Sequence, residues 1–189
     1  WSEGADGVAD VFLPSEGAAP VPVLVFVHGG RWRINTSRET AFWAPALVGA
    51  GCACVVLNFP QLPAVSLRAM AAAVRAGVAA MLAAAPALGL DPRRAMLAGH
   101  SSGAHLALAA ALGPGPGGTV QAAPWLSDLR ALLLLGGMYD LRPLVRTAPA
   151  EVLSFDAEEA EAMSPVLALS RAPALAGLPP VLVGVGEEE

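Results

Sequence analysis

The sequence contains no lysine, and it has only three histidines, two cysteines and one tyrosine among 189 residues. All 11 basic residues are therefore arginines, and they are scattered along the chain rather than clustered. A nucleic-acid-binding protein carries its basic residues together on one face or along one helix. This scatter, together with the net charge of −5, leads us to exclude nucleic acid as a partner.

Cysteine is too scarce for a disulfide framework or a metal site. Cys52 and Cys54 stand two positions apart in an apolar run, so on a strand they would point to the same side. No histidine or aspartate lies near them in the sequence to complete a metal site. We predict buried core thiols, no bound metal and a reducing compartment, the cytoplasm.

Long uninterrupted apolar runs are also missing, although 55% of the residues are hydrophobic. A membrane span needs roughly 18 or more consecutive apolar residues. Arg75 interrupts the alanine-rich stretch 69–85, and Gly51 and Asn58 punctuate the run around Cys52. We therefore expect no membrane span and no membrane partner. The composition is too apolar for disorder, and the length suits one domain with its own core.

The two ends of the sequence lead to a further expectation. The chain begins with Trp1 rather than methionine, and it ends at Glu189 directly after an apolar run. We expect both ends to be cut, so that residues 1–189 form a single, incomplete domain. The last strand and helix would then be missing, and the bare apolar edge would favour self-association. Nothing in the sequence predicts an oligomeric state.

Short apolar runs predict the strands, which we place at residues 8–13, 23–27, 52–57, 95–98, 131–135 and 181–185. They are apolar at almost every position, a pattern typical of parallel strands covered on both faces. Helical spacing of apolar residues predicts one helix from Leu67 to Leu82 and another from Ser102 to about Leu112. This alternation predicts an α/β fold, with a mostly parallel central sheet and helices on both faces.

Two segments lack apolar periodicity. Residues 113–118 (GPGPGG) are predicted to be a plain connecting loop. Residues 142–165 are polar and irregular, and we expect them to form a small cap segment. Within this segment Asp156 and Glu159 predict a helix start, which Ser164-Pro165 would end.

Residues 99–103 (GHSSG) fit the pattern G-x-S-x-G between a predicted strand and a predicted helix. Such a sharp strand-to-helix turn holds its serine in a strained conformation and exposes the hydroxyl at the strand end. The following helix presents free N–H groups and a partial positive charge at its first turn. The pattern therefore predicts Ser101 as a nucleophile and the N–H of Ser102 as an oxyanion donor.

Residues 27–30 (VHGG) follow the first strong strand and predict the rest of an oxyanion hole. Glycine lets the backbone approach a bound carbonyl closely, so that the N–H groups of Gly29 and Gly30 would point at it. We expect His28 to prop this loop rather than to act as a base. Arg31, Trp32 and the cap segment would line the substrate pocket. Trp32 could stack on an aromatic group of the substrate or pack on the core.

Three stretches together resemble the kynurenine formamidase (arylformamidase) branch of the α/β-hydrolases, which groups with hormone-sensitive-lipase-like esterases. They are HGGRW at 28–32, GHSSGAHL at 99–106 and GMYDLRPL at 137–144. The resemblance extends from Val8 to the end of the chain, and the YDLRPL part discriminates best. It implies hydrolysis of an aryl formamide such as N-formylkynurenine, or of a small carboxylic ester. No metal or organic cofactor would be needed.

The resemblance also bears on the rest of a catalytic triad, which in this fold follows the order serine, acid, histidine. Spacing from Gly186 in relatives implies Glu189 as the acid, with Asp140 as the alternative or as a loop anchor. All three histidines, His28, His100 and His105, precede these acids, and none fits the base. We expect His105 to pack or hydrogen-bond behind the serine, and the isolated chain to turn over little substrate. The alternative function is a non-catalytic binding protein or inactive fragment of the same fold.

Overall fold

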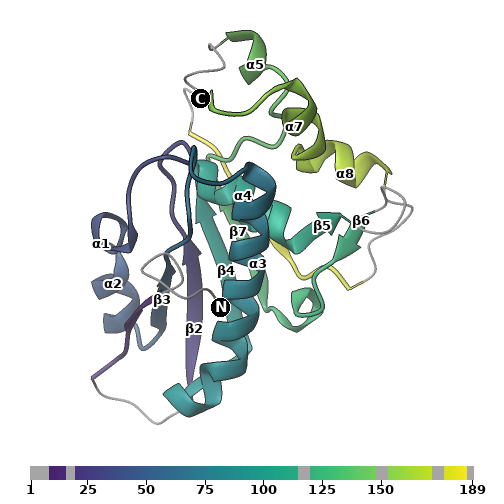
Figure 1. Ribbon diagram of the computed structural model, residues 1–189. Coiled ribbons are helices and arrows are strands. Elements are labelled where there is room, and N and C mark those ends of the chain that lie inside the picture. The colour runs from purple at the N-terminus through teal and green to yellow at the C-terminus, as the bar shows by residue number, and fades with distance from the viewer. Residues whose placement is uncertain (1–8, 16–19, 115–119, 148–152, 172–176, 187–189) are drawn as a thin grey trace.

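The computed structural model describes residues 9–15, 20–114, 120–147, 153–171 and 177–186. Six strands form one sheet in the order β1-β3-β2-β4-β7-β8 (Figure 1). They are β1 (Ala9–Phe12), β2 (Val21–Val27), β3 (Ala53–Leu57), β4 (Leu90–His100), β7 (Ala131–Leu135) and β8 (Val181–Gly184). β1 pairs antiparallel with β3, and the other four pairings are parallel. The predicted mostly parallel α/β sheet is confirmed.

Helices cover both faces of this sheet (Figure 1). They are α1 (Ser37–Thr40), α2 (Ala44–Gly49), α3 (Leu67–Ala84), α4 (Ser102–Ala111), α5 (Leu144–Thr147), α7 (Ala157–Ala162), α8 (Pro165–Arg171) and the 3-10 turns η2 (Ala85–Leu88) and η4 (Leu126–Asp128). Alternate residues of β2 enter two separate cores. Val23 and Val25 pack with α3 and α4, whereas Leu24 and Phe26 pack with α2. Burial on both faces explains why the strands are apolar at almost every position.

The helix predicted from Leu67 is confirmed and has clear boundaries. The Ser66 hydroxyl caps its first turn by accepting from the N–H of Ala69 at 3.2 Å. Gly89, at a φ of 71°, ends the following 3-10 turn in the left-handed conformation. Among the described helices, Leu67–Leu88 is long and apolar enough to cross a membrane by length and composition alone. Its buried residues, however, lie at helical spacing and pack in the core.

The glycine-rich segment 113–118 differs from the prediction of a plain loop. Gly113 and Pro114 belong to a short strand, β5 (Leu112–Pro114), which pairs antiparallel with β6 (Val120–Ala122). The Arg75 guanidinium holds this hairpin by donating to the carbonyls of Ala110, Gln121 and Ala122. Three-residue strands carry too little periodicity to be read from sequence. The remaining residues of the segment, 115–118, lie outside the described part of the chain.

The described part of segment 142–165 contains α5 and α7, and the predicted start of α7 is confirmed. The Asp156 side chain accepts from the N–H of Glu159 at 2.9 Å, as an N-cap does. Ser164-Pro165 ends this helix but also opens α8, because proline fits the first turn of a helix. The Ser164 hydroxyl donates to the Ala160 carbonyl at 2.6 Å and accepts from the N–H of Leu141 at 2.8 Å.

The prediction for the two cysteines is confirmed: both thiols are free and buried. They lie in the core between the sheet and α2. Burial raises the pKa of both thiols, that of Cys54 to about 12. Such thiols remain protonated and unreactive at neutral pH.

Candidate active site

Strand β4 and helix α4 meet in a sharp turn at Ser101. Ser101 has a φ of 54° and a ψ of −127°, a backbone conformation that residues other than glycine rarely adopt. Glycine is required on both sides of it. A Cβ at Gly99 would lie 2.6 Å from the carbonyl carbon of Gly103, and a Cβ at Gly103 would overlap the carbonyl oxygens of Val27 and His28. The glycines of G-x-S-x-G therefore let α4 pack directly against the end of β2.

Ser101 faces a cavity of about 550 Å³ at the carboxyl ends of the strands. Its backbone N–H donates to the Leu135 carbonyl at 2.8 Å, which ties the turn to the end of β7. Gly29, Gly30 and Arg31 line the same cavity. Four of the residues predicted from sequence are thus brought together. The remaining walls are mainly aromatic and aliphatic and include Phe26, Ile34, Phe42, Trp43, Ala98, Leu133 and Leu135.

The loop after β2 lies so close to Ser101 that no side chain fits at Gly29. A Cβ at Gly29 would lie 3.0 Å from the Ser101 Cβ and 2.8 Å from the His100 carbonyl oxygen. Gly30 has a φ of 127°, a conformation open only to glycine. His28 Nδ1 and Asn35 Nδ2 lie 2.9 Å and 3.3 Å from the Gly29 carbonyl oxygen. Because a peptide's C=O and N–H point in opposite directions, these contacts orient the Gly30 N–H.

Trp32 packs in the core, the second of the two alternatives left open by the sequence. It is 5% exposed and makes T-shaped ring contacts with His105 and Phe155. It is not among the residues that line the cavity beside Ser101. The prediction that Trp32 lines the substrate pocket is therefore wrong, and the cause lies in the backbone at this position. Arg31 and Trp32 both have positive φ, which turns the chain back toward α4.

The segment 142–165 was expected to line the pocket with Arg31, but its described residues do not line the cavity beside Ser101. They pack instead over α3 and α4. The Arg68 N–H donates to the Glu159 carboxylate at 3.3 Å, and His105 Nε2 lies 2.7 Å from the Met163 carbonyl oxygen. Arg31 itself is exposed at the cavity wall.

None of the three histidines hydrogen-bonds to Ser101 within the described residues. His28 is buried and stacks on Phe59 at a centroid distance of 4.4 Å, and desolvation lowers its pKa. His105 is fully buried, and desolvation lowers its pKa to about 4. His100 is exposed and lines the cavity. His28 and His105 therefore have the supporting positions expected of them.

Of the two candidate acids, Glu189 and Asp140, the structure describes only Asp140. Glu189 lies outside the described residues, so its predicted role stays a prediction. Both carboxylate oxygens of Asp140 accept from the Arg142 guanidinium, at 2.9 Å and 2.6 Å, and one also accepts from the Arg142 N–H. These bonds lower the pKa of Asp140 to about 2. Asp140 thus anchors its own loop, which was the role favoured for it.

Two polar residues of the cavity wall, Asn35 and Glu39, were not foreseen. Glu39 belongs to a capping box with Thr36, in which its carboxylate accepts from the Thr36 N–H at 2.7 Å. The spacing Thr-x-x-Glu is a known start signal for a helix and would have located α1. No comparable signal marks Asn35, whose contact with Gly29 depends on the path of the whole loop.

Comparison with known proteins gives consistent matches. The family model BD-FAE matches residues 9–116, more than half of the chain. The kynurenine formamidase of Danio rerio is 29% identical over 177 residues, which cover 90% of this chain and 55% of that protein. The isoprenylcysteine alpha-carbonyl methylesterase of Arabidopsis thaliana is 30% identical over 138 residues, covering 72% of this chain and 32% of that protein.

A solved structure of a candidate thioesterase from Silicibacter sp. TM1040 superposes with a TM-score of 0.77 at 30% identity. The match covers 98% of this chain and 64% of that one. The chain thus spans about half the length of the kynurenine formamidase it matches.

Proposed function

Because the chain belongs to the BD-FAE family of the α/β-hydrolases, we propose that it is the part of a serine acyl hydrolase that carries the nucleophile, Ser101. One observation carries the proposal: Ser101, held at a φ of 54°, lines the same cavity as Gly29 and Gly30. In the reaction, the Ser101 Oγ would attack the carbonyl carbon of the substrate. The carbonyl oxygen would become an oxyanion that accepts hydrogen bonds from the N–H groups of Gly29, Gly30 and Ser102.

The oxyanion donors would supply much of the catalysis. Each such donor is typically worth about 3–4 kcal/mol in the transition state. Collapse of the tetrahedral intermediate would break the bond to the leaving group, which takes up the proton lost by the Ser101 hydroxyl and departs as the alcohol or amine. An ester would remain on Ser101, and water would then hydrolyse it. Ser102 opens α4, so its N–H has no partner within the helix and is free to act as a donor.

Two substrate classes fit, an aryl formamide and a small carboxylic ester. The relatives support both, since one is a kynurenine formamidase and another a methylesterase. The largely aromatic and aliphatic cavity wall suits an apolar substrate in either case. Turnover of N-formylkynurenine compared with that of p-nitrophenyl acetate, on a protein as long as the relatives, distinguishes them.

We also propose that the 189-residue chain alone turns over little substrate, because no histidine hydrogen-bonds to Ser101 within the described residues. Loss of one triad member leaves about 10³–10⁴-fold catalysis over water, from the oxyanion hole and binding. The acid role of Glu189 is part of the same proposal. Steady hydrolysis of p-nitrophenyl acetate by this chain that vanished in Ser101→Ala would contradict the low turnover but support the nucleophile.

The direct test of the nucleophile is slow covalent labelling by a fluorophosphonate, followed by mass spectrometry. We expect the label on Ser101 in the unaltered chain and none at that position in Ser101→Ala. In Ser102→Ala the label should still be found on Ser101, whatever its rate, because the Ser102 hydroxyl is buried, accepts from the Trp32 N–H and is not the proposed nucleophile. Absence of any label on Ser101, in a chain shown to be folded, would favour a non-catalytic binding protein of the same fold.

A further inference from the structure

Trp32 connects the Gly29–Gly30 loop to helix α4 through both its backbone and its side chain. Its backbone N–H donates to the Ser102 Oγ at 3.2 Å. Its indole Nε1 donates to His105 Nδ1 at 3.1 Å. Ser102 and His105 are three residues apart and so lie on one side of the first turn of α4. We call this pair of hydrogen bonds the Trp32 latch.

The chemistry of the indole decides which tautomer His105 adopts. An indole N–H can only donate, so His105 Nδ1 must be the unprotonated acceptor. The ring proton is therefore on Nε2, which donates to the Met163 carbonyl oxygen at 2.7 Å. His105 is 0% exposed, and a neutral ring with this tautomer satisfies both of its nitrogens. The same ring thus joins the loop, α4 and the end of α7.

The latch acts on a strained segment. Arg31 and Trp32 have φ values of 52° and 61°, which non-glycine residues rarely adopt and which persist only when surrounding contacts hold them. The ring contacts of Trp32 with His105 and Phe155, at centroid distances of 5.4 Å and 5.7 Å, add to the hold. Without the two hydrogen bonds to α4, the loop would relax toward an ordinary conformation.

The position of the latch links it to the reacting groups. Ser102 follows Ser101 directly, and Trp32 lies two residues after Gly30. A shift of Trp32 away from α4 would move the Gly29 and Gly30 amides away from Ser101. We propose that Ser102 and His105 are positioning residues, which hold Trp32 and through it keep these amides beside Ser101. This inference rests on the proposed function, in which the amides stabilise an oxyanion.

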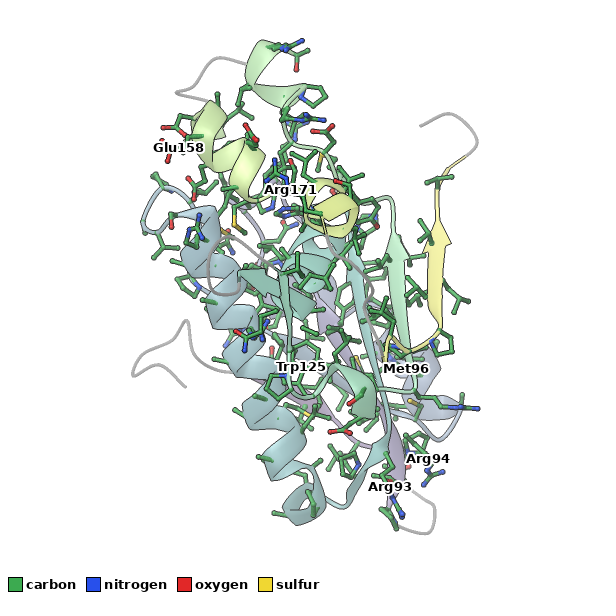
Figure 2. All side chains as sticks on the ribbon, turned by 90° about the vertical axis from the view of Figure 1, so that its right-hand side faces the viewer. Arg93, Arg94, Met96, Trp125, Glu158 and Arg171 are labelled. Atoms are coloured by element: carbon green, nitrogen blue, oxygen red, sulfur yellow. The ribbon has the colours of Figure 1, made fainter. Side chains whose placement is uncertain are left out.

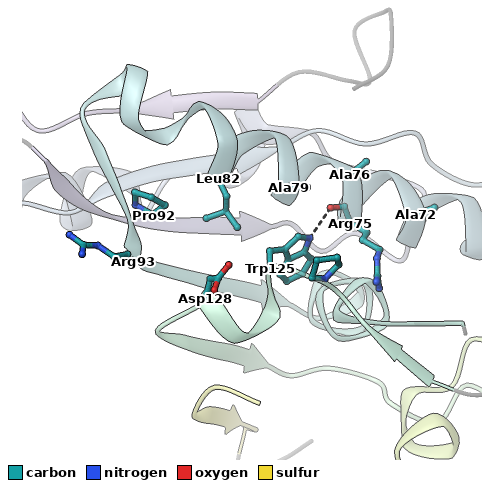
Figure 3. Close-up of a pocket in the computed structure, with 10 residues that line it drawn as sticks. Ala72, Arg75, Ala76, Ala79, Leu82, Pro92, Arg93, Trp125 and Asp128 are labelled. Atoms are coloured by element: carbon teal, nitrogen blue, oxygen red, sulfur yellow. Dashed lines mark hydrogen bonds between the residues drawn. The ribbon is translucent and has the colours of Figure 1, made fainter. Parts of the chain in front are cut away.

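Trp32→Phe tests the latch, because it keeps an aromatic ring but removes the indole N–H together with the five-membered ring that carries it. The chain offers a matched control in Trp125, which is 7% exposed against 5% for Trp32 and whose indole donates to the Arg75 carbonyl oxygen at 3.2 Å (Figure 3). Figure 3 shows this tryptophan in a groove between α3 and η4, and it does not line the cavity of Ser101. Trp125→Phe therefore loses the same kind of bond without touching the loop.

Two measurements are made on each variant: the rate of Ser101 labelling by a fluorophosphonate, and hydrogen exchange of the peptide covering residues 28–35. We expect Trp32→Phe to slow labelling by about tenfold or more, since phosphonylation also develops charge on an oxygen facing the donors. Exchange in the peptide should rise. Trp125→Phe should label within about twofold of the unaltered chain and leave the exchange of this peptide unchanged. Ser102→Ala, a smaller change, should act in the same direction as Trp32→Phe.

The outcomes separate the two ideas. If the unaltered chain labels and both Trp32→Phe and Ser102→Ala label at its rate, the latch is refuted and the proposed nucleophile stands. If the unaltered chain does not label at Ser101, the proposed function fails. Hydrogen exchange then still decides whether the latch holds the loop. Equal slowing by Trp125→Phe would mean a general loss of stability and would also refute the positioning role.

Discussion

Gly103→Ala is a sharp test of how α4 is seated against the sheet. A Cβ at this position would overlap the carbonyl oxygens of Val27 and His28 and would lie 2.6 Å from the carbonyl carbon of His28. That distance is at least 0.8 Å short of the 3.4 Å at which ordinary contact begins. The three nearest atoms all belong to the backbone of Val27 and His28, so no rotamer change can relieve the overlap.

The expected cost follows from two opposing effects. Overpacking of a well-packed interior costs typically about 1–3 kcal/mol, and a backbone obstruction places this site at the upper end. Replacing a helical glycine by alanine returns about 1 kcal/mol of helix propensity. We therefore expect Gly103→Ala to lower the free energy of unfolding by roughly 2 kcal/mol, measured by urea denaturation followed by circular dichroism. Ser101 labelling should slow as well, because β2 leads directly into Gly29.

Gly49→Ala is the matched control. Gly49 is also helical, in α2, but a Cβ there would meet nothing within 4 Å. Only the higher helix propensity of alanine then acts, so we expect the free energy of unfolding to rise by about 0.5–1 kcal/mol. If Gly103→Ala were as stable as Gly49→Ala, the close seating of α4 on β2 would be refuted, and with it the explanation of the Ser101 turn.

Four further outcomes follow from other contacts. Arg75→Met removes three bonds to backbone carbonyls and should lower the free energy of unfolding in urea by roughly 2 kcal/mol. Burial lowers the pKa of His105 from 6.5 to about 4, so the folded state binds fewer protons. The free energy of unfolding should therefore be unaffected by His105 above about pH 6.5 and should fall by about 3 kcal/mol as the pH drops to about 4, because the unfolded state takes up the proton first. In His105→Gln, urea titrations at the same pH values should lack this fall. Iodoacetamide at about pH 8 should alkylate Cys54 only after urea unfolding, because burial raises the pKa of this thiol to about 12. Leu182→Lys should reduce self-association in sedimentation, since β8 lies at the edge of the sheet (Figure 2) and Leu182 is 55% exposed.

The parts of the fold that sequence predicted are those in which burial dictates every residue of a segment. The predicted strand 131–135 coincides with β7, because its leucines pack alternately into the cores on the two faces of the sheet. The helix from Ser102 coincides with α4, all of whose residues are buried. Short elements at the rim were missed, among them β5, because a three-residue strand has no periodic face. It is held by its pairing with β6 and by the hydrogen bonds of Arg75.

The candidate site divides in the same way. Gly29, Gly30, Ser101 and Arg31 were predicted together because a glycine loop and a strand-to-helix turn are local features, each written in a few consecutive residues. The direction of Trp32 was not predictable. Its indole finds His105 73 residues away, and only because two positive φ values reverse the loop before it. A sequence pattern specifies which backbone turns are possible. The direction of a neighbouring side chain, however, depends on contacts with residues that are distant in the sequence and close only in the folded chain. For this reason the residues proposed to carry the chemistry could be picked out in the sequence, whereas the contacts of Trp32 with Ser102 and His105 became visible only in the structure.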